Sequence, residues 1–395
     1  MQVLNLENAK MEGDAIPDYA MYDPIQFEMG FWLKIRRIIL PEGVVSIGKA
    51  AFPFMGIEEI NIPSTVREIG STAFGYDRWL NCNIVIPEGV EEIKYQTFNE
   101  CNRMTIAPIL PKSLKKIGEH AFSMTRFDNL TFPDGLEEIG QGAFQDCGLT
   151  SVHLPNTCLV IGDMAFQLSK MIKDIVLPTD LECIPFGLFS MCDGLETLKI
   201  HANCRRIEDS AFLLCSNLRE IIFNQNLETI GFDAFYGCAL TTLNLPPSLC
   251  QLGALSFGAM SSTLHQVWCA AQVPPICTEN PLYPDEFPFS IPNRNEEFTL
   301  FVPVGTSDSY SAKWGWDCFF KIEETDDFSW SGIDVVNDFD TNLIDKEVTI
   351  YNLQGHKVFY TFCYNGEPLD LPSNIYIVVT PNGSHKRNII QSNSL

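Results

Sequence analysis

The stretch LETIGFDAFYGCALTTLNLP, residues 227–246, holds one full unit of a pattern that recurs along most of the chain. An Ile-Gly-x-x-Ala-Phe segment is followed by an alternating apolar segment that ends at a proline. Similar units return ten times at spacings of 22–24 residues, and a fixed period of this length indicates a solenoid of stacked coils. The phenylalanines that mark the register are Phe52, Phe74, Phe98, Phe122, Phe144, Phe166, Phe189, Phe212, Phe235 and Phe257.

Other positions of the unit are nearly as regular. Eleven residues before the phenylalanine, eight of ten units have proline, and the exceptions are His201 and Asn224. Five residues before it, nine units have isoleucine and the tenth has Leu252. Proline cannot donate to a sheet ladder, so it is expected to end a strand and turn the chain. The Ile-Gly pair is expected to let the backbone bend, and the phenylalanine to fill the interior of the coil.

The segment before each proline alternates as a strand does. Residues one and three positions before the proline should point inward, and the residue between them should point outward. Stacking would gather the outward residues in a column, which suggests a recognition strip. The alternative is the ordinary preference of exposed sheets for Val, Ile and Thr. We call the candidate ligand-binding residues the strand-face column: Val85, Ile109, Thr131, His153, Val176, Lys199 and Ile222.

Half of the fourteen cysteines follow the same register, and two of these, Cys158 and Cys204, stand eight residues before a repeat phenylalanine. Five of them stand three residues after a repeat phenylalanine: Cys101, Cys147, Cys192, Cys215 and Cys238. A thiol site or a disulfide ladder is one interpretation, and small buried apolar side chains that stack on one another is the other. The regular register favours the second, with free thiols.

Units such as LPEGVVSIGKAAF (residues 40–52) and residues 227–246 resemble the BspA-like leucine-rich repeats of bacterial surface proteins. The resemblance covers roughly residues 34–324 and includes VWCAAQVPPICTENP and LFVPVGTSDSYSAKWGWDCFFKI. Within the latter piece, Trp314, Trp316, Phe319 and Phe320 are expected to cap the last coil. The resemblance implies surface display and adhesion to host or neighbouring-cell proteins, without a catalytic site.

The expected fold is mostly β, a leucine-rich-repeat solenoid of about ten coils followed by a small β-sandwich. Its parts are residues 1–33, an N-terminal lead or cap; 34–262, the solenoid; 263–322, its C-terminal end; 323–333, a linker; and 334–395, the sandwich. The pieces IYNLQGHKV, LPSNIYIVV and KRNII resemble the C-terminal sorting domain of type IX secretion substrates. An insertion at residues 359–370 departs from that pattern, and an Ig-like accessory domain is the alternative.

Composition and motifs exclude several classes of function. The formal net charge is −24 and the pI is near 4.5, so the surface repels nucleic acid and anionic lipid. No apolar run is long enough to span a membrane, and no secretory signal peptide is visible. The six histidines are too dispersed for a metal motif, and phosphate-binding and nucleophile-elbow motifs are missing. No catalytic residue, metal or cofactor is therefore expected.

These observations predict a non-enzymatic, extracellular or cell-surface protein that uses its solenoid surface for adhesion. The expected partner is a host-matrix or neighbouring-cell protein, or a glycan. Nucleic-acid binding and membrane insertion are not expected, and a monomer is. The alternative is a structural spacer or assembly scaffold without a specific ligand.

Overall fold

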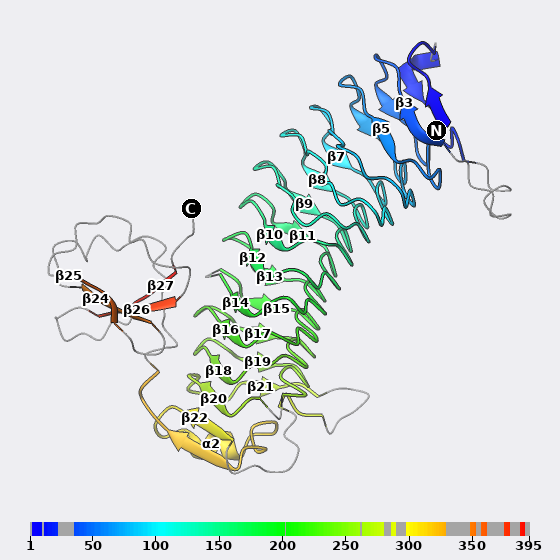
Figure 1. The fold of residues 1–395 in the computed structure, drawn as a ribbon. Helices are drawn as coiled ribbons and strands as arrows, with labels where there is room; N and C mark the ends of the chain where they lie inside the picture. Colours follow the sequence, from blue (N-terminus) through cyan, green and yellow to red (C-terminus); the bar gives the residue numbers. More distant parts are fainter. Residues whose placement is uncertain are drawn as a thin grey trace.

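The computed structural model describes residues 2–9, 12–22, 35–201, 203–260, 263–279, 286–289, 298–328 and four strands between residues 348 and 391. The chain is mostly β and winds into a solenoid of about 12 turns, stacked along a curved axis (Figure 1). The predicted fold class is therefore confirmed, with turns added beyond the ten that carry the repeat phenylalanine. Within the described ranges no helix is long enough to cross a membrane.

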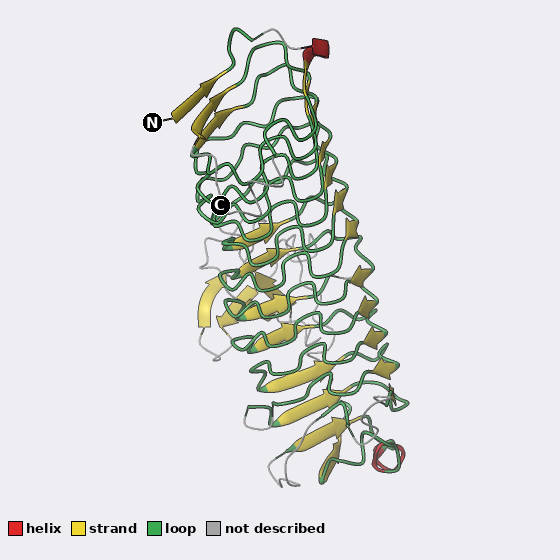
Figure 2. Ribbon diagram, turned by 90° about the vertical axis from the view of Figure 1, so that its right-hand side faces the viewer, coloured by secondary structure: helices red, strands yellow, loops and turns green. Residues whose placement is uncertain are grey.

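The turns contribute to two rows of parallel strands, which lie on opposite edges of the solenoid (Figure 2). The first row is the predicted strand face: β1 (Gln2–Asn5), β3 (Ile35–Ile39), β5 (Glu59–Asn61), β10 (Ser151–His153), β12 (Asp174–Val176), β14 (Thr197–Lys199), β16 (Glu220–Ile222), β18 (Thr242–Leu245), β20 (Gln266–Cys269), β22 (Thr299–Val302) and β23 (Lys321–Glu324).

The second row contains strands of two residues and runs through the repeat isoleucine. Its members are β2 (Ala15–Ile16), β4 (Ser46–Ile47), β6 (Glu68–Ile69), β7 (Glu92–Ile93), β8 (Lys116–Ile117), β9 (Glu138–Ile139), β11 (Val160–Ile161), β13 (Cys183–Ile184), β15 (Arg206–Ile207), β17 (Thr229–Ile230), β19 (Gln251–Leu252) and β21 (Ile276–Cys277). Two short helices complete the solenoid, η1 (Glu12–Asp14) and α2 (Ser307–Ser311).

The proline between the two rows starts a turn, as the sequence predicts. The carbonyl of Pro133 accepts a hydrogen bond from Leu136 N at 3.0 Å, and Pro155 accepts one from Cys158 N at 3.0 Å. His201 replaces proline in one coil, and its carbonyl accepts from Cys204 N at 3.1 Å in the same way. The turn therefore does not require proline, which explains why His201 is tolerated in the register.

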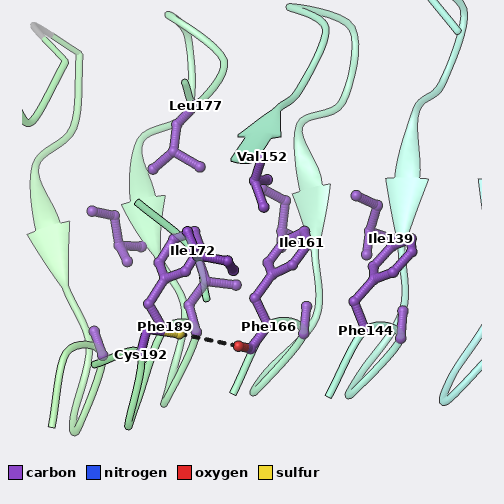
Figure 3. Close-up of a cluster of buried hydrophobic side chains, with 14 of the residues drawn as sticks. Ile139, Phe144, Val152, Ile161, Phe166, Ile172, Leu177, Phe189 and Cys192 are labelled. Atoms are coloured by element: carbon purple, nitrogen blue, oxygen red, sulfur yellow. Dashed lines mark hydrogen bonds between the residues drawn. The ribbon is translucent and has the colours of Figure 1, made fainter. Parts of the chain in front are cut away.

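The repeat phenylalanines form a continuous stack through the core. The rings of Phe166 and Phe189 are 5.4 Å apart and tilted by 11°, and the other neighbouring pairs are similar (Figure 3). Phe289 extends the stack beyond the ten units, at 5.7 Å from Phe257. The prediction that these rings fill the coil interior is confirmed, because all ten repeat rings are buried. Each ring contacts only its neighbours, so the core is held by a chain of local contacts.

The register cysteines are buried free thiols, as predicted. They also donate hydrogen bonds, which the sequence did not suggest. Cys192 Sγ donates to the carbonyl of Phe166 in the preceding coil at 3.3 Å (Figure 3), and Cys215 Sγ to Phe189 at 3.2 Å. Ser169 holds the same position and donates to Phe144 at 2.9 Å. Burial raises the pKa of Cys215 to about 12, so this thiol is a poor nucleophile.

The glycine after the repeat isoleucine was expected to let the backbone bend, but the structure gives a different reason for it. A Cβ added at Gly162 would lie 2.4 Å from the backbone nitrogen of Gln141 in the preceding coil. At Gly140 the corresponding distance, to Glu119 N, is 2.6 Å. Neither glycine has a positive φ. The residue is needed because adjacent backbones approach closely here.

The loop around the repeat phenylalanine forms a third ladder between coils. Phe52 N donates to Ala73 O at 2.9 Å, and Phe54 N donates to Gly75 O in the next coil at 3.2 Å. In all ten units the residues two before and two after the phenylalanine have a positive φ, such as Ala50 (47°) and Phe54 (60°). Only Gly142, Gly187 and Gly237 among these twenty residues are glycines.

The first described residues add a turn to the stack. Strand β1 pairs with β3, and Ile16 in β2 pairs with Ile47 in β4. Met21 N donates to Ala51 O at 3.0 Å, which places Met21 beside the repeat Phe52. Methionine at the phenylalanine position hides this turn from a search for the repeat.

At the other end, aromatic residues close the core. Trp316 Nε1 donates to the carbonyl of Pro275 at 2.9 Å, and both Trp316 and Phe319 are buried. Trp314 is half-buried against the core. Phe320, however, is 60% exposed, so the expectation that it helps to cap the last coil is wrong. It follows the buried Phe319 directly in the chain, just before β23 begins at Lys321.

Four further strands lie near the C-terminus: β24 (Val348–Asn352), β25 (Lys357–Thr361), β26 (Ile375–Val379) and β27 (Asn388–Gln391). They form one antiparallel sheet in the order β25-β24-β26-β27. The second sheet of the expected sandwich is not among the described residues. The expected linker overlaps β23 at its start, and its residues 329–333 lie outside the described residues.

Candidate functional site

The structure brings six residues of the strand-face column together as three pairs in register. Val85 pairs with Ile109 in an isolated parallel bridge, His153 pairs with Val176, and Lys199 pairs with Ile222. The inward neighbours Val152 and Leu154 are buried, whereas His153 between them is exposed. The alternation expected from the sequence therefore sets which side chains face outward.

Exposure changes along the column. Val85, Ile109, Thr131, His153 and Val176 are exposed, whereas Lys199 and Ile222 are half-buried. Burial lowers the pKa of the Lys199 ammonium and raises the pKa of the nearby Glu220 carboxyl. Because a ligand gains most from exposed apolar side chains, the N-terminal part of the column offers the better contact surface.

The row is also discontinuous, which the sequence did not predict. Thr131 lies in no strand, and in the described part of the solenoid β12 and β14 are not joined by a ladder. His153 Nε2 and Asp174 Oδ2 form an exposed hydrogen-bonded pair between β10 and β12. The column is therefore a series of separate two-residue pairs. The His153–Asp174 hydrogen bond makes its middle part polar.

Sequence reasoning missed the C-terminal continuation of the column. Asn244 pairs with Trp268, and Trp268 pairs with Phe301, so two aromatic residues extend the outward positions. Their rings stack with centroids 3.8 Å apart, and Phe328 lies edge-on to Trp268 at 6.3 Å. The spacing of 22–24 residues ends at Phe257, because the next stacked phenylalanine, Phe289, is 32 residues later, so register counting stops there. The alternation in QVWC and TLFV was the signal that could have found them.

Across the described ranges no group of three or more His, Cys, Asp or Glu side chains could hold a metal ion. The one acidic side chain that is completely buried there is Asp77. Its Oδ1 accepts hydrogen bonds from Gly56 N at 2.9 Å and from Ile57 N at 3.5 Å, and its Oδ2 has no partner. This geometry ties two adjacent coils together and presents no acid or base to a ligand.

Burial raises the pKa of the Asp77 carboxyl well above its ordinary value, although the hydrogen bonds from Gly56 and Ile57 oppose the shift. A group whose pKa is higher in the folded state stabilises the fold below its unfolded pKa. That contribution is lost as the pH rises through the folded pKa. Asp77→Asn, which has no proton to lose, should therefore reduce the fall in melting temperature between pH 5 and pH 8.

Thermal unfolding of both proteins across this pH range provides the measurement. The variant should be at least as stable as the wild type at pH 8, because a neutral amide avoids burying a charge. Parallel pH profiles for the two proteins would show that Asp77 stays in one protonation state throughout.

The coils, their parallel rows and the stacked core define a β-solenoid with an extended surface and no catalytic constellation among its described residues. The model of the BspA type leucine-rich repeat region matches residues 30–148 and 137–264, in six copies. The chain belongs to this family. Its family and fold are typical of non-enzymatic scaffolds. No curated protein sequence matches the chain.

Solved structures of leucine-rich repeat proteins are similar to the chain, and the first has the same fold. A leucine-rich repeat protein from Bacteroides ovatus is 25% identical, with a TM-score of 0.52, over 73% of this chain and 69% of that chain. A leucine rich cell surface protein from Faecalibacterium prausnitzii is 18% identical, with a TM-score of 0.33, over 68% and 87%. The pneumococcal vaccine antigen PcpA is 18% identical, with a TM-score of 0.44, over 82% and 89%.

Proposed function

We propose that this protein is a non-enzymatic binding protein that recognises another protein through the outer face of its first strand row. The observation that carries the proposal is the exposed part of the strand-face column. There, Val85, Ile109 and Val176 remain exposed at outward positions of the first strand row. Exposed aliphatic side chains held in register on a rigid scaffold form a preorganised contact surface.

The arrangement favours binding over a purely spacing role. A spacer needs only the inward core, which the phenylalanine stack supplies, and its outward residues would be free to be polar. The preference of sheets for Val and Ile explains part of the column. It does not explain Ile109 well, because this residue forms only a single bridge and is 54% exposed.

We further infer that the protein acts outside the cell or on its surface. The family supports this location, and the resemblance of the last 60 or so residues to a sorting domain would supply an export signal. The antiparallel order of β24, β25, β26 and β27 is compatible with such a domain. Export therefore forms part of the proposal.

The proposal is tested with purified protein against arrays of matrix proteins and glycans, followed by titration of each hit. Thr131 and Val176 are both exposed, so the double variant Thr131→Asp/Val176→Asp should fold normally. Its affinity for the bound matrix protein should fall at least about tenfold, or roughly 1.4 kcal/mol, because central interface residues dominate binding.

The matched control is Val45→Asp/Gln141→Asp, which places the same charges at exposed positions outside the column. This control should bind as the wild type does. Loss of binding in the control alone would move the interface to another face. Arrays without a saturable hit would favour the spacer role.

A further inference from the structure

Two adjacent coils are longer than the others between the ten repeat phenylalanines. Phe74 is followed by Phe98 after 24 residues, and Phe98 by Phe122 after another 24, against 22 or 23 elsewhere. The added length lies between the phenylalanine and the proline, where Phe74 and Pro87 are 13 residues apart. In the coil of Phe144 and Pro155 that separation is 11. We call residues 75–86 and 99–110 the long-loop pair.

The long-loop pair is firmly anchored. Leu80 and Met104 are completely buried, and each directly follows an exposed residue, Trp79 and Arg103 respectively. Between the loops, Asn81 Oδ1 accepts hydrogen bonds from Thr105 N at 3.0 Å and from Ile106 N at 3.2 Å. The exposed residues are therefore held in place by buried neighbours, which lowers the entropy cost of binding.

The long-loop pair holds an arginine against an exposed aromatic ring. The guanidinium of Arg103 lies 3.6 Å from the centroid of the Trp79 ring, and Trp79 remains 46% exposed. Its neighbour Arg78 is neutralised by Glu100 at 3.0 Å. Arg103, in contrast, forms no ion pair with any residue that the structure describes. A guanidinium stacked on a ring keeps the N–H donors at its edge, and these match a carboxylate.

Exposed aliphatic side chains adjoin this pair. Ile106 stands three residues after Arg103 and is 43% exposed, and Ile109 follows it and pairs with Val85. Trp and Arg are the residues that most often dominate protein interfaces, particularly when apolar neighbours exclude water around them. Aromatic residues and arginine are enriched in protein interfaces relative to the rest of the surface, so this composition favours a protein partner.

We propose that the long-loop pair is a docking site for a protein segment that carries an aspartate or glutamate next to a large apolar side chain. The carboxylate would pair with Arg103, and the apolar side chain would lie against Trp79 and Ile106. This inference rests on the proposed binding function and locates its main contact at one end of the strand-face column. The charge complementarity is local, because Arg103 is held over the Trp79 ring on a chain with a net charge of −24.

The test uses a phage-displayed library of random 12-residue peptides selected on the intact protein. Enriched peptides should share an acidic residue beside Trp, Phe, Leu or Ile. By fluorescence anisotropy, Trp79→Ala and Arg103→Gln should each weaken the best peptide at least about tenfold. Phe186→Ala and Arg219→Gln alter an exposed ring and an exposed guanidinium elsewhere, and should leave its affinity unchanged.

The proposed docking site would be wrong if the enriched peptides lack an acidic residue, or if they bind Trp79→Ala and Arg103→Gln as tightly as the wild type. If Thr131→Asp/Val176→Asp instead weakens the binding of such peptides, the proposed function stands and only the location of the binding site changes. A library from which nothing is enriched on the wild-type protein counts against both.

Discussion

Replacing Phe189 by alanine is expected to lower the free energy of unfolding by about 3–5 kcal/mol, the usual loss when a buried phenylalanine site is emptied. The ring is completely buried between Phe166, at 5.4 Å, and Phe212, at 5.8 Å. Its removal would interrupt the stack in the middle of the solenoid. Because coils stabilise only their neighbours, amide exchange should accelerate most in residues 166–212.

The control for this change lies in the same coil. Phe186 is 41% exposed, so Phe186→Ala removes the same atoms from the surface and should change stability by less than about 0.5 kcal/mol. Chemical denaturation monitored by circular dichroism gives the free energies, and hydrogen exchange gives their location. Equal losses for both variants, or unchanged protection in residues 166–212, would show that the stack does not hold the coils together.

Replacing Gly162 by alanine should destabilise the fold by about 1–3 kcal/mol or more, the usual cost of overpacking. The added methyl group would lie 2.4 Å from Gln141 N and 2.7 Å from Gly140 C. Both are backbone atoms of the preceding coil, which cannot rotate away as a side chain would. The coils would have to separate, and the hydrogen bond from Gly162 N to Ile139 O, now 2.7 Å, would weaken.

Gly135→Ala is the matched control, because a Cβ there would meet nothing closer than Lys115 Nζ at 3.4 Å. Gly135 also has no positive φ, so alanine should be neutral or slightly stabilising through its smaller unfolded-state entropy. Melting temperatures of the two variants provide the comparison. If Gly162→Ala is as stable as Gly135→Ala, close approach between coils is not why glycine follows the repeat isoleucine.

The sequence was informative about this fold because one unit is repeated with little change. A phenylalanine every 22–24 residues requires a coil that encloses it, and alternation before the proline separates Val152 and Leu154 from His153. The register failed where the residue type or the spacing changed. Met21 replaces the phenylalanine in the first turn, and Phe289 stacks on Phe257 but follows it by 32 residues. Counting identical residues at a fixed spacing finds neither turn.

For the candidate site, the sequence predicted which residues of the column face outward, but it could not predict how exposed they are. Val176 and Ile222 occupy the same register position, yet the first is exposed and the second is half-buried. The interaction between Trp79 and Arg103 was likewise hidden, since the two residues are 24 positions apart and belong to no repeated motif. Such contacts depend on the distance between neighbouring coils.

By itself, therefore, the sequence determined the period, the inward residues, the turn at the proline and the buried free cysteines. Only the tertiary structure decided the backbone conformation between these positions. Phe54 and Met124 are in the left-handed region, which costs about 1–2 kcal/mol for an L-residue, and no residue preference predicts this. They adopt it because Phe54 N and Met124 N must donate to Gly75 O and Gln145 O of the next coil. Hydrogen bonds between coils, which exist only after stacking, outweigh the local preference of each residue.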